Sequence, residues 1–128
     1  MTNTLCSPVG RAPEVIESGL RARTEVTVPP DEKVFPGHYP GFPIYPGVCI
    51  VECVHRSALA TVPGSADEWE MHAVEATRFV APVFPGDALS IGIDWSQRDG
   101  AWRCKALVSS DRGEVAQVRL RFGPRRPR

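Results

Sequence analysis

The sequence lacks the long apolar runs that would carry a chain into or across a membrane. No stretch of its 128 residues approaches the roughly 18 consecutive apolar residues that a membrane-spanning helix needs. The first residues, MTNTLCSPVGRAPE, contain no apolar signal-peptide core. We therefore expect a cytoplasmic protein that does not interact with a membrane.

The four cysteines lack the spacing of a metal or redox site. They form no CxxC pair and no Cys/His cluster at zinc spacing, so we predict no metal. Cys49 and Cys53 are four positions apart in an apolar stretch. This spacing indicates two stacked, buried thiols on one helix.

The chain also has no excess of either charge. Fifteen basic residues balance fifteen acidic ones, and five of the basic residues lie in the last ten positions. The remainder is therefore acidic, which argues against a nucleic-acid partner. The tail GPRRPR is either a solubilising end or a landing site for an acidic partner.

The apolar pattern predicts one domain over residues 1–128, with flexible ends at 1–12 and 123–128. A short strand is expected around residues 14–17, and residues 20–28 alternate between apolar and polar as a half-buried strand does. Four further strands are predicted at 69–81, 88–96, 101–109 and 114–122. Tight turns join the last of these, which implies an antiparallel sheet.

Between the two groups of strands lies one helix candidate, which begins at Pro46 and ends before Pro63-Gly64. It is apolar on most sides, and this is typical of a buried helix. The expected class is α+β, with an antiparallel sheet of about six strands wrapped around one long buried helix. This arrangement is the hotdog fold.

The segment before the helix is dense in proline and glycine. Residues 29–47 contain nine of them, which excludes a regular element and predicts a stiff loop. A long ordered loop in a compact domain is usually functional. His38 lies in this loop, and histidine suits a general base near neutral pH. Alternatively, His38 is a loop residue that bonds a backbone carbonyl.

Glu52 stands in the apolar helix, where a carboxyl group is costly unless it is paired or protonated. A protonated carboxyl group suits a general acid. One base and one acid are what the elimination of water beside a thioester carbonyl requires. Alternatively, Glu52 forms an ordinary i,i+4 ion pair with Arg56.

The start of the helix supplies hydrogen-bond donors for an oxygen that becomes negative. Pro46 has no N–H, so the first donors are the backbone N–H groups of Gly47 and Val48. Because Gly47 has no side chain, a substrate carbonyl can approach it closely. We therefore predict that Gly47 and Val48 bind substrate.

The segment FPGHYPGFPIYPGVCIVECV resembles the active-site segment of the 3-hydroxyacyl-[acyl carrier protein] dehydratases of the FabZ/FabA type. In that family the acidic residue follows the histidine by fourteen positions, as Glu52 follows His38 here. The segment EATRFVAPVFPGDAL resembles the family's strand and PGD turn. The resemblance covers roughly residues 14–122, and its His-to-Glu segment is highly specific.

The resemblance implies dehydration of a 3-hydroxyacyl thioester to the trans-2-enoyl thioester, in fatty acid or polyketide biosynthesis. His38 and Glu52 would be catalytic, and the substrate would sit on the phosphopantetheine arm of acyl carrier protein. No metal or diffusible cofactor is implied. The resemblance further implies a homodimer or heterodimer, possibly within a higher oligomer, in which His38 of one chain faces Glu52 of the other.

Several residues depart from the family pattern or have no role in it. The family commonly has glutamine where this chain has Arg56. His55 either shares the proton of Glu52 or, as we favour, is a residue of the helix surface or an interface. No role is assigned to His72, whereas Trp69, Trp95 and Trp102 are expected in the core or an interface.

Two other functions remain open at this point. One is a hotdog acyl thioesterase, which would hydrolyse the thioester bond. The other is a non-catalytic subunit that binds acyl carrier protein or completes a heterodimer.

Overall fold

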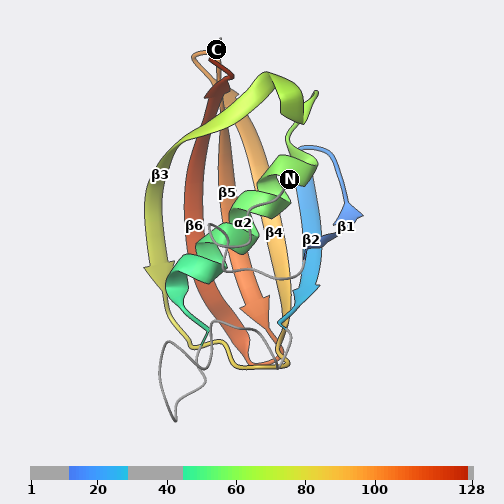
Figure 1. Ribbon diagram of the computed structural model, residues 1–128, viewed down its shortest axis with the longest axis vertical. Helices are drawn as coiled ribbons and strands as arrows, with labels where there is room; N and C mark the ends of the chain where they lie inside the picture. The colour runs from blue at the N-terminus through green and yellow to red at the C-terminus, as the bar shows by residue number, and fades with distance from the viewer. Residues whose placement is uncertain (1–11, 29–44, 127–128) are drawn as a thin grey trace.

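The chain forms one antiparallel sheet and a single long helix that crosses it (Figure 1). The computed structural model describes residues 12–28 and 45–126. The elements in chain order are β1 (Glu14–Glu17), β2 (Arg21–Thr27), α2 (Gly47–Thr61), the 3-10 turn η1 (Ala66–Glu68), β3 (Trp69–Phe79), β4 (Ala88–Arg98), β5 (Ala101–Ser110) and β6 (Gly113–Pro124).

The six strands are ordered β1-β2-β4-β5-β6-β3 across the sheet, and every pairing is antiparallel. The helix lies across one face of this sheet, between β3 at one edge and β1 at the other (Figure 1). The predicted α+β hotdog architecture is therefore confirmed. None of the helices in the described ranges has both the length and the apolar character that a membrane span requires.

Strand alternation places the predicted faces toward the helix. Ala22, Thr24, Val26 and Val28 of the first long strand are all buried, as the period of two requires. Leu20 was expected on the same face but is 60% exposed, because β2 begins only at Arg21. The strand predicted at 69–81 ends earlier, at Phe79.

The helix begins and ends where the sequence predicted. Pro46 is its N-cap residue in an extended conformation, and Gly47 is its first residue. At the other end, the Val62 N–H donates to the Ala58 carbonyl at 2.8 Å. Gly64 then takes a φ of 83°, a value that L side chains rarely adopt, and turns the chain toward η1.

The fully buried residues of α2 lie on one side of the helix. One stripe of α2 is buried against the sheet, and it consists of Cys49, Ile50, Cys53, Val54, Ser57, Ala58 and Thr61. The opposite side includes Val48, whose exposed fraction is 68%, and Glu52, which is partly exposed. A single sheet covers only one side of a helix, so the described strands leave this second side more exposed.

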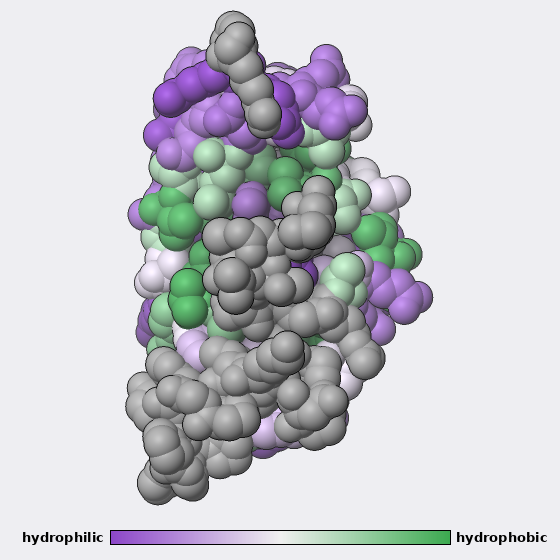
Figure 2. All heavy atoms as spheres, viewed as in Figure 1, coloured by the Kyte–Doolittle hydropathy of each residue, from purple (hydrophilic) through white to green (hydrophobic). Residues whose placement is uncertain are grey.

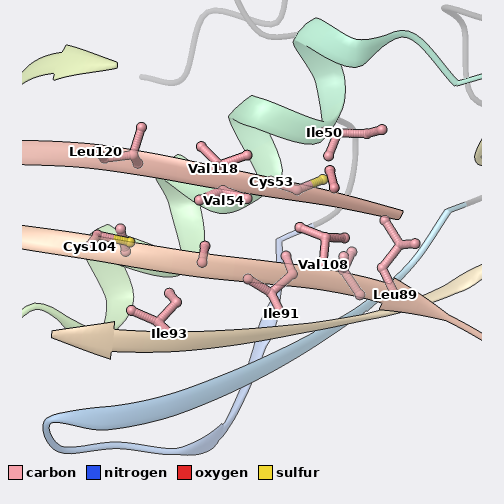
Figure 3. Close-up of a cluster of buried hydrophobic side chains, with 14 of the residues drawn as sticks. Ile50, Cys53, Val54, Leu89, Ile91, Ile93, Cys104, Val108, Val118 and Leu120 are labelled. Atoms are coloured by element: carbon pink, nitrogen blue, oxygen red, sulfur yellow. The ribbon is translucent and has the colours of Figure 1, made fainter. Parts of the chain in front are cut away.

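The core lies between this stripe and the sheet (Figure 3). Ile50, Cys53 and Val54 of the helix meet buried side chains from three central strands, which include Ile91, Cys104, Val118 and Leu120. Phe122 and Trp95 extend the core with an edge-on ring contact at 5.7 Å, and Trp102 packs edge-on against Trp95 and Trp69. The tryptophans thus fill the core and its margin, as predicted.

Two buried hydrogen bonds join the helix to the strands, and a third within the helix orients the Thr61 hydroxyl. The Thr24 and Ser57 hydroxyls bond each other at 2.7 Å. One turn on, the Thr61 hydroxyl donates to the Ser57 carbonyl at 2.8 Å, and Trp95 Nε1 donates to Thr61 Oγ1 at 3.2 Å. Because these bonds have directions, they fix where α2 sits along its own axis, which apolar contacts alone do not.

The turn at Phe84–Asp87 is held by a charge pair. The Asp87 carboxylate accepts from the Phe84 N–H at 2.9 Å and from the Arg112 guanidinium, which also lies 5.1 Å from the centre of the Phe84 ring. Partial burial acts to raise the pKa of Asp87. The bonds from Arg112 and Phe84 outweigh burial, so the pKa lies below its usual value.

The last strand extends into the end that we expected to be flexible. β6 runs through Gly123 and Pro124. Beyond it, the Arg125 N–H donates to the Glu68 carbonyl at 2.9 Å, and the Arg126 N–H donates to a Glu70 carboxylate oxygen at 2.7 Å. The latter bond lowers the pKa of Glu70. Residues 123–126 are thus tied to β3 and η1.

Candidate active site

Three of the four predicted site residues lie on the first turns of α2, and the fourth, His38, lies outside the described residues. Gly47, Val48 and Glu52 belong to one continuous helical segment, because Gly47 starts α2 and Glu52 follows five residues later. The structure therefore brings the predicted substrate-binding and acidic residues close together. The catalytic role of His38 stays a prediction.

The start of α2 leaves two backbone donors available. The Pro46 carbonyl accepts from the N–H groups of Cys49 at 3.0 Å and Ile50 at 3.3 Å. No described residue accepts a hydrogen bond from the N–H of Gly47 or Val48. The helix dipole adds a partial positive charge at this end. This arrangement suits an oxygen that gains negative charge during a reaction.

Phe79, at the end of β3, packs directly over Gly47. A Cβ atom placed on Gly47 would lie 3.0 Å from Cζ of the Phe79 ring, so any larger residue at position 47 would displace that ring. From the sequence, we explained Gly47 by the close approach of a substrate carbonyl, and we assigned Phe79 only to a strand. The aromatic residue just before the APVFPGD turn was the sequence signal for this contact, and we did not use it.

An apolar hollow opens beside this contact. It has a volume of about 420 Å³ and is lined by Tyr45, Gly47, Ile50, Phe79, Val80, Ala81 and Pro82. Tyr45 is fixed there by its N–H, which donates to the Val83 carbonyl at 2.7 Å. The hollow places apolar surface next to the N–H groups of the helix start, as a site for an acyl thioester requires.

Glu52 is neither fully buried nor unpaired, in contrast to the buried carboxyl group that the apolar helix suggested. Its side chain is 29% exposed. Its Oε2 accepts from Nε of Arg56 at 3.2 Å, and its Oε1 lies 3.3 Å from Nδ1 of His55. The i,i+4 pair that was weighed as an alternative is therefore formed, and both carboxyl oxygens have a partner.

His72, to which we assigned no role, has a packing function that explains a glycine. A Cβ atom on Gly123 of the paired strand would lie 2.2 Å from Cε1 of the His72 ring. The ring occupies the space that a side chain at position 123 would need. Among the described residues, none bonds its buried Nε2. Glu52 is absent from its contacts.

The described cysteines behave as buried apolar residues. Cys49, Cys53 and Cys104 are buried in the core, and burial raises the pKa of the Cys104 thiol to about 12. Within residues 12–28 and 45–126, no group of three or more His, Cys, Asp or Glu side chains is placed to hold a metal ion.

Comparison with known proteins assigns this fold and site to a class. Residues 14–118 match the family described as ApeI-like, ApeI dehydratase. The chain belongs to this family and is a dehydratase of the FabZ/FabA-like group.

Curated relatives carry the same designation. The chain is 34% identical to the 3-hydroxyacyl-[acyl-carrier-protein] dehydratase FabZ of Myxococcus xanthus, over 85% of this chain and 75% of the relative. It is 37% identical to the FabZ of Symbiobacterium thermophilum, over 84% of this chain and 79% of that one.

Solved structures share the fold at lower identity. The dehydratase heterocomplex ApeI:P from Xenorhabdus doucetiae superposes with a TM-score of 0.69 at 23% identity, over 88% of this chain and 99% of that one. The fluoroacetyl-CoA thioesterase FlK superposes with a TM-score of 0.67 at 15% identity, over 86% of this chain and 88% of that one. At these identities the likeness shows the fold alone.

Proposed function

We propose that this dehydratase removes water from a 3-hydroxyacyl thioester carried by acyl carrier protein and forms the trans-2-enoyl thioester. The observation that carries the proposal is the arrangement at the start of α2. Two available N–H groups, an apolar hollow and the Glu52 carboxyl group occur within the first two turns of one helix. Relatives more than 30% identical are named for this activity.

The proposed reaction divides the work among four residues. His38 takes the proton from the carbon beside the thioester carbonyl, and Glu52 protonates the hydroxyl group that leaves as water. The N–H groups of Gly47 and Val48 stabilise the negative charge that develops on the thioester oxygen. An acid and a base are sufficient for this elimination, so the proposal requires neither metal nor diffusible cofactor.

The edge strand β3 supports a dimer with shared sites. β3 is the last strand of the sheet, and no described strand pairs with its outer edge. Val74, Phe79 and Val80 are each more than 40% exposed there, and apolar residues reach the surface on this side (Figure 2). An exposed apolar edge strand favours pairing with another chain. We propose that a homodimer or heterodimer forms along β3, with His38 of one subunit facing Glu52 of the other.

The outer face of the sheet supports an acidic carrier protein as partner. Lys105 lies directly opposite Arg119, and Arg103 lies opposite Arg121 on the same two strands. Like charges in such register destabilise a sheet. Glu75 offsets one pair, because it lies 3.1 Å from Arg103 and 3.4 Å from Arg121. No described carboxylate forms an ion pair with Lys105 or Arg119, so an acidic partner would relieve their repulsion.

Mass spectrometry of a short 3-hydroxyacyl thioester tests the function. We expect a product lighter by one water, whether the substrate is attached to acyl carrier protein or to a pantetheine mimic. Release of the free acid would identify a thioesterase instead. No change on either carrier would favour a non-catalytic subunit.

Site variants test the assignment of roles. His38→Ala and Glu52→Gln are expected to abolish dehydration, whereas His72→Ala serves as the control for loss of a histidine away from the site. Mixing the two inactive variants should restore part of the activity, because one composite site in each mixed dimer would be intact. No recovery after proven subunit exchange would contradict the shared site.

The carrier-binding face has its own test. The double variant Lys105→Ala/Arg119→Ala should raise KM for the substrate on acyl carrier protein and leave KM for the pantetheine substrate unchanged. Arg98→Ala, at the turn that joins β4 to β5, is the control for loss of a basic residue elsewhere on the sheet. An equal rise in KM for both substrates would contradict a role in carrier binding.

A further inference from the structure

The two oxygens of the Glu52 carboxyl group have chemically different partners. Oε2 accepts from Nε of Arg56 at 3.2 Å. A guanidinium keeps its protons at every pH at which proteins fold, so this partner donates a hydrogen bond but never releases a proton. Oε1 lies 3.3 Å from Nδ1 of His55, and an imidazole can both donate and accept a proton. Only Oε1 therefore has a described partner that can pass a proton to the carboxyl group.

The surroundings of His55 suit a group that exchanges protons with water. Its side chain is 25% exposed, so solvent reaches it while Glu52 holds it from one side. On α2 the charged groups that face it are Glu52 and Arg56. From the sheet, the ring that packs against it is the uncharged Phe122 of β6, with ring centres 6.3 Å apart.

We propose that His55 supplies, through Glu52, the proton that leaves with the substrate hydroxyl. His55 is then a positioning and proton-supplying residue that acts through the carboxyl group and does not touch the substrate. This inference rests on the proposed dehydration. It adds that the acid of the reaction is the His55–Glu52 couple and not Glu52 alone.

The proton balance of the step is complete. The base takes one proton from the carbon beside the carbonyl, and the bond between the β-carbon and the hydroxyl oxygen breaks. The hydroxyl takes a proton from Oε1 of Glu52 and departs as water, while a proton moves from Nδ1 of His55 to Oε1. His55 then regains a proton from solvent, and the base returns one, so the enzyme ends as it began.

His55→Gln is the informative variant, because glutamine can hydrogen-bond Oε1 but cannot titrate. We expect kcat to fall by about tenfold or more, with little change in KM. This loss is smaller than the roughly 10²–10⁴-fold loss that removal of a complete acid–base group causes. The pH dependence of kcat should also differ between His55→Gln and the wild type, because glutamine has no proton to supply. His72→Gln, the same change at a histidine without contact to Glu52, should leave both kcat and the pH profile unchanged.

Arg56 provides a second test through coupling. Once Arg56→Gln removes the guanidinium from Oε2, that oxygen can carry a proton of its own, and His55 becomes less important. The double variant His55→Gln/Arg56→Gln should therefore lose less activity than the two single losses predict. Additive losses would overturn the relay, as would a slow His55→Gln enzyme whose pH profile matches that of the wild type.

Binding between the two groups can also be measured without turnover. The ¹⁵N chemical shift of Nδ1 of His55, measured by NMR at one pH, should differ between Glu52→Gln and the wild type, because the variant removes the carboxylate that lies 3.3 Å away. An unchanged shift would overturn the coupling. A wild type without dehydratase activity would contradict the proposed function, whereas an active wild type matched by His55→Gln in kcat and pH profile would contradict the relay alone.

Discussion

The two sides of α2 have different compositions and different tasks. The side toward the sheet carries small and apolar residues, with hydroxyl groups only where Thr24 and Trp95 can bond them. The other side carries Glu52, His55 and Arg56, and the Glu52 carboxylate contacts both of the others one turn further along. The comparison leads us to expect that stability and chemistry depend on different residues of one helix. Variants on one side should change one property and leave the other intact.

The largest effect is expected from the outer side. Glu52→Gln keeps the shape of the side chain but removes the acid, so kcat should fall by about 10²–10⁴-fold. The melting temperature should change little, since a partly exposed ion pair contributes about 1 kcal/mol or less. Parallel kinetics and thermal melts check both statements. A large fall in melting temperature would show that the two sides are not separable.

The core that covers the inner side should show the opposite behaviour. Ile91 is fully buried in the same cluster as Val54 of the helix. Ile91→Ala should lower the free energy of unfolding by about 2–5 kcal/mol, because it removes buried methyl groups and leaves a cavity. Urea denaturation measures this loss. The kcat of the folded fraction should stay close to that of the wild type.

A smaller effect is expected from the hydrogen bond between Thr24 and Ser57. Ser57→Ala leaves the buried Thr24 hydroxyl without its partner, which should cost about 1–3 kcal/mol of unfolding free energy. Thr24→Val in the same chain removes the unpaired group, so the double variant should recover much of the loss. Chemical denaturation of the four chains gives the coupling energy. Equal losses in the single and double variants would contradict the bond's proposed role.

The smallest effect should come from the Phe84–Asp87 turn, away from both sides of the helix. The folded state lowers the pKa of Asp87, so this group stabilises the fold above its unfolded pKa of about 3.9 and loses that contribution as pH falls through the folded value. Arg112→Gln should therefore cost about 1 kcal/mol or less near neutral pH and shift acid unfolding to higher pH. Circular dichroism at falling pH follows both. Identical acid midpoints would contradict the pairing.

Several elements of the fold could be predicted from local sequence patterns, because interactions between nearby residues determine them. The alternation along residues 20–28 and 88–96 gave the faces of β2 and β4, and Pro46 and Gly64 delimited the helix. One prediction was wrong where burial depends on what else is nearby. Leu20 kept the strand period but lies before β2 and is exposed.

The candidate site likewise combines features that the local sequence predicts with contacts that it does not. The spacing of the PGHYPG segment and Glu52 predicted the family, because a motif records which residue types a reaction needs, and the catalytic role of Glu52 stays a prediction. The contact between Phe79 and Gly47 joins residues 32 positions apart, and no local pattern encodes it. Arg56 was recognised as a departure from the family. Whether it points toward Glu52 depended on a rotamer that sequence does not specify.

The sequence by itself determined the family, the antiparallel class and the limits of the helix, since each follows from periodicity, breakers and a motif within one segment. Only the tertiary structure decided which side of α2 is covered, which ring lies over Gly47 and which partner each oxygen of Glu52 has. The physical reason is that such contacts join distant segments, and their geometry depends on the packing of the whole sheet against the helix.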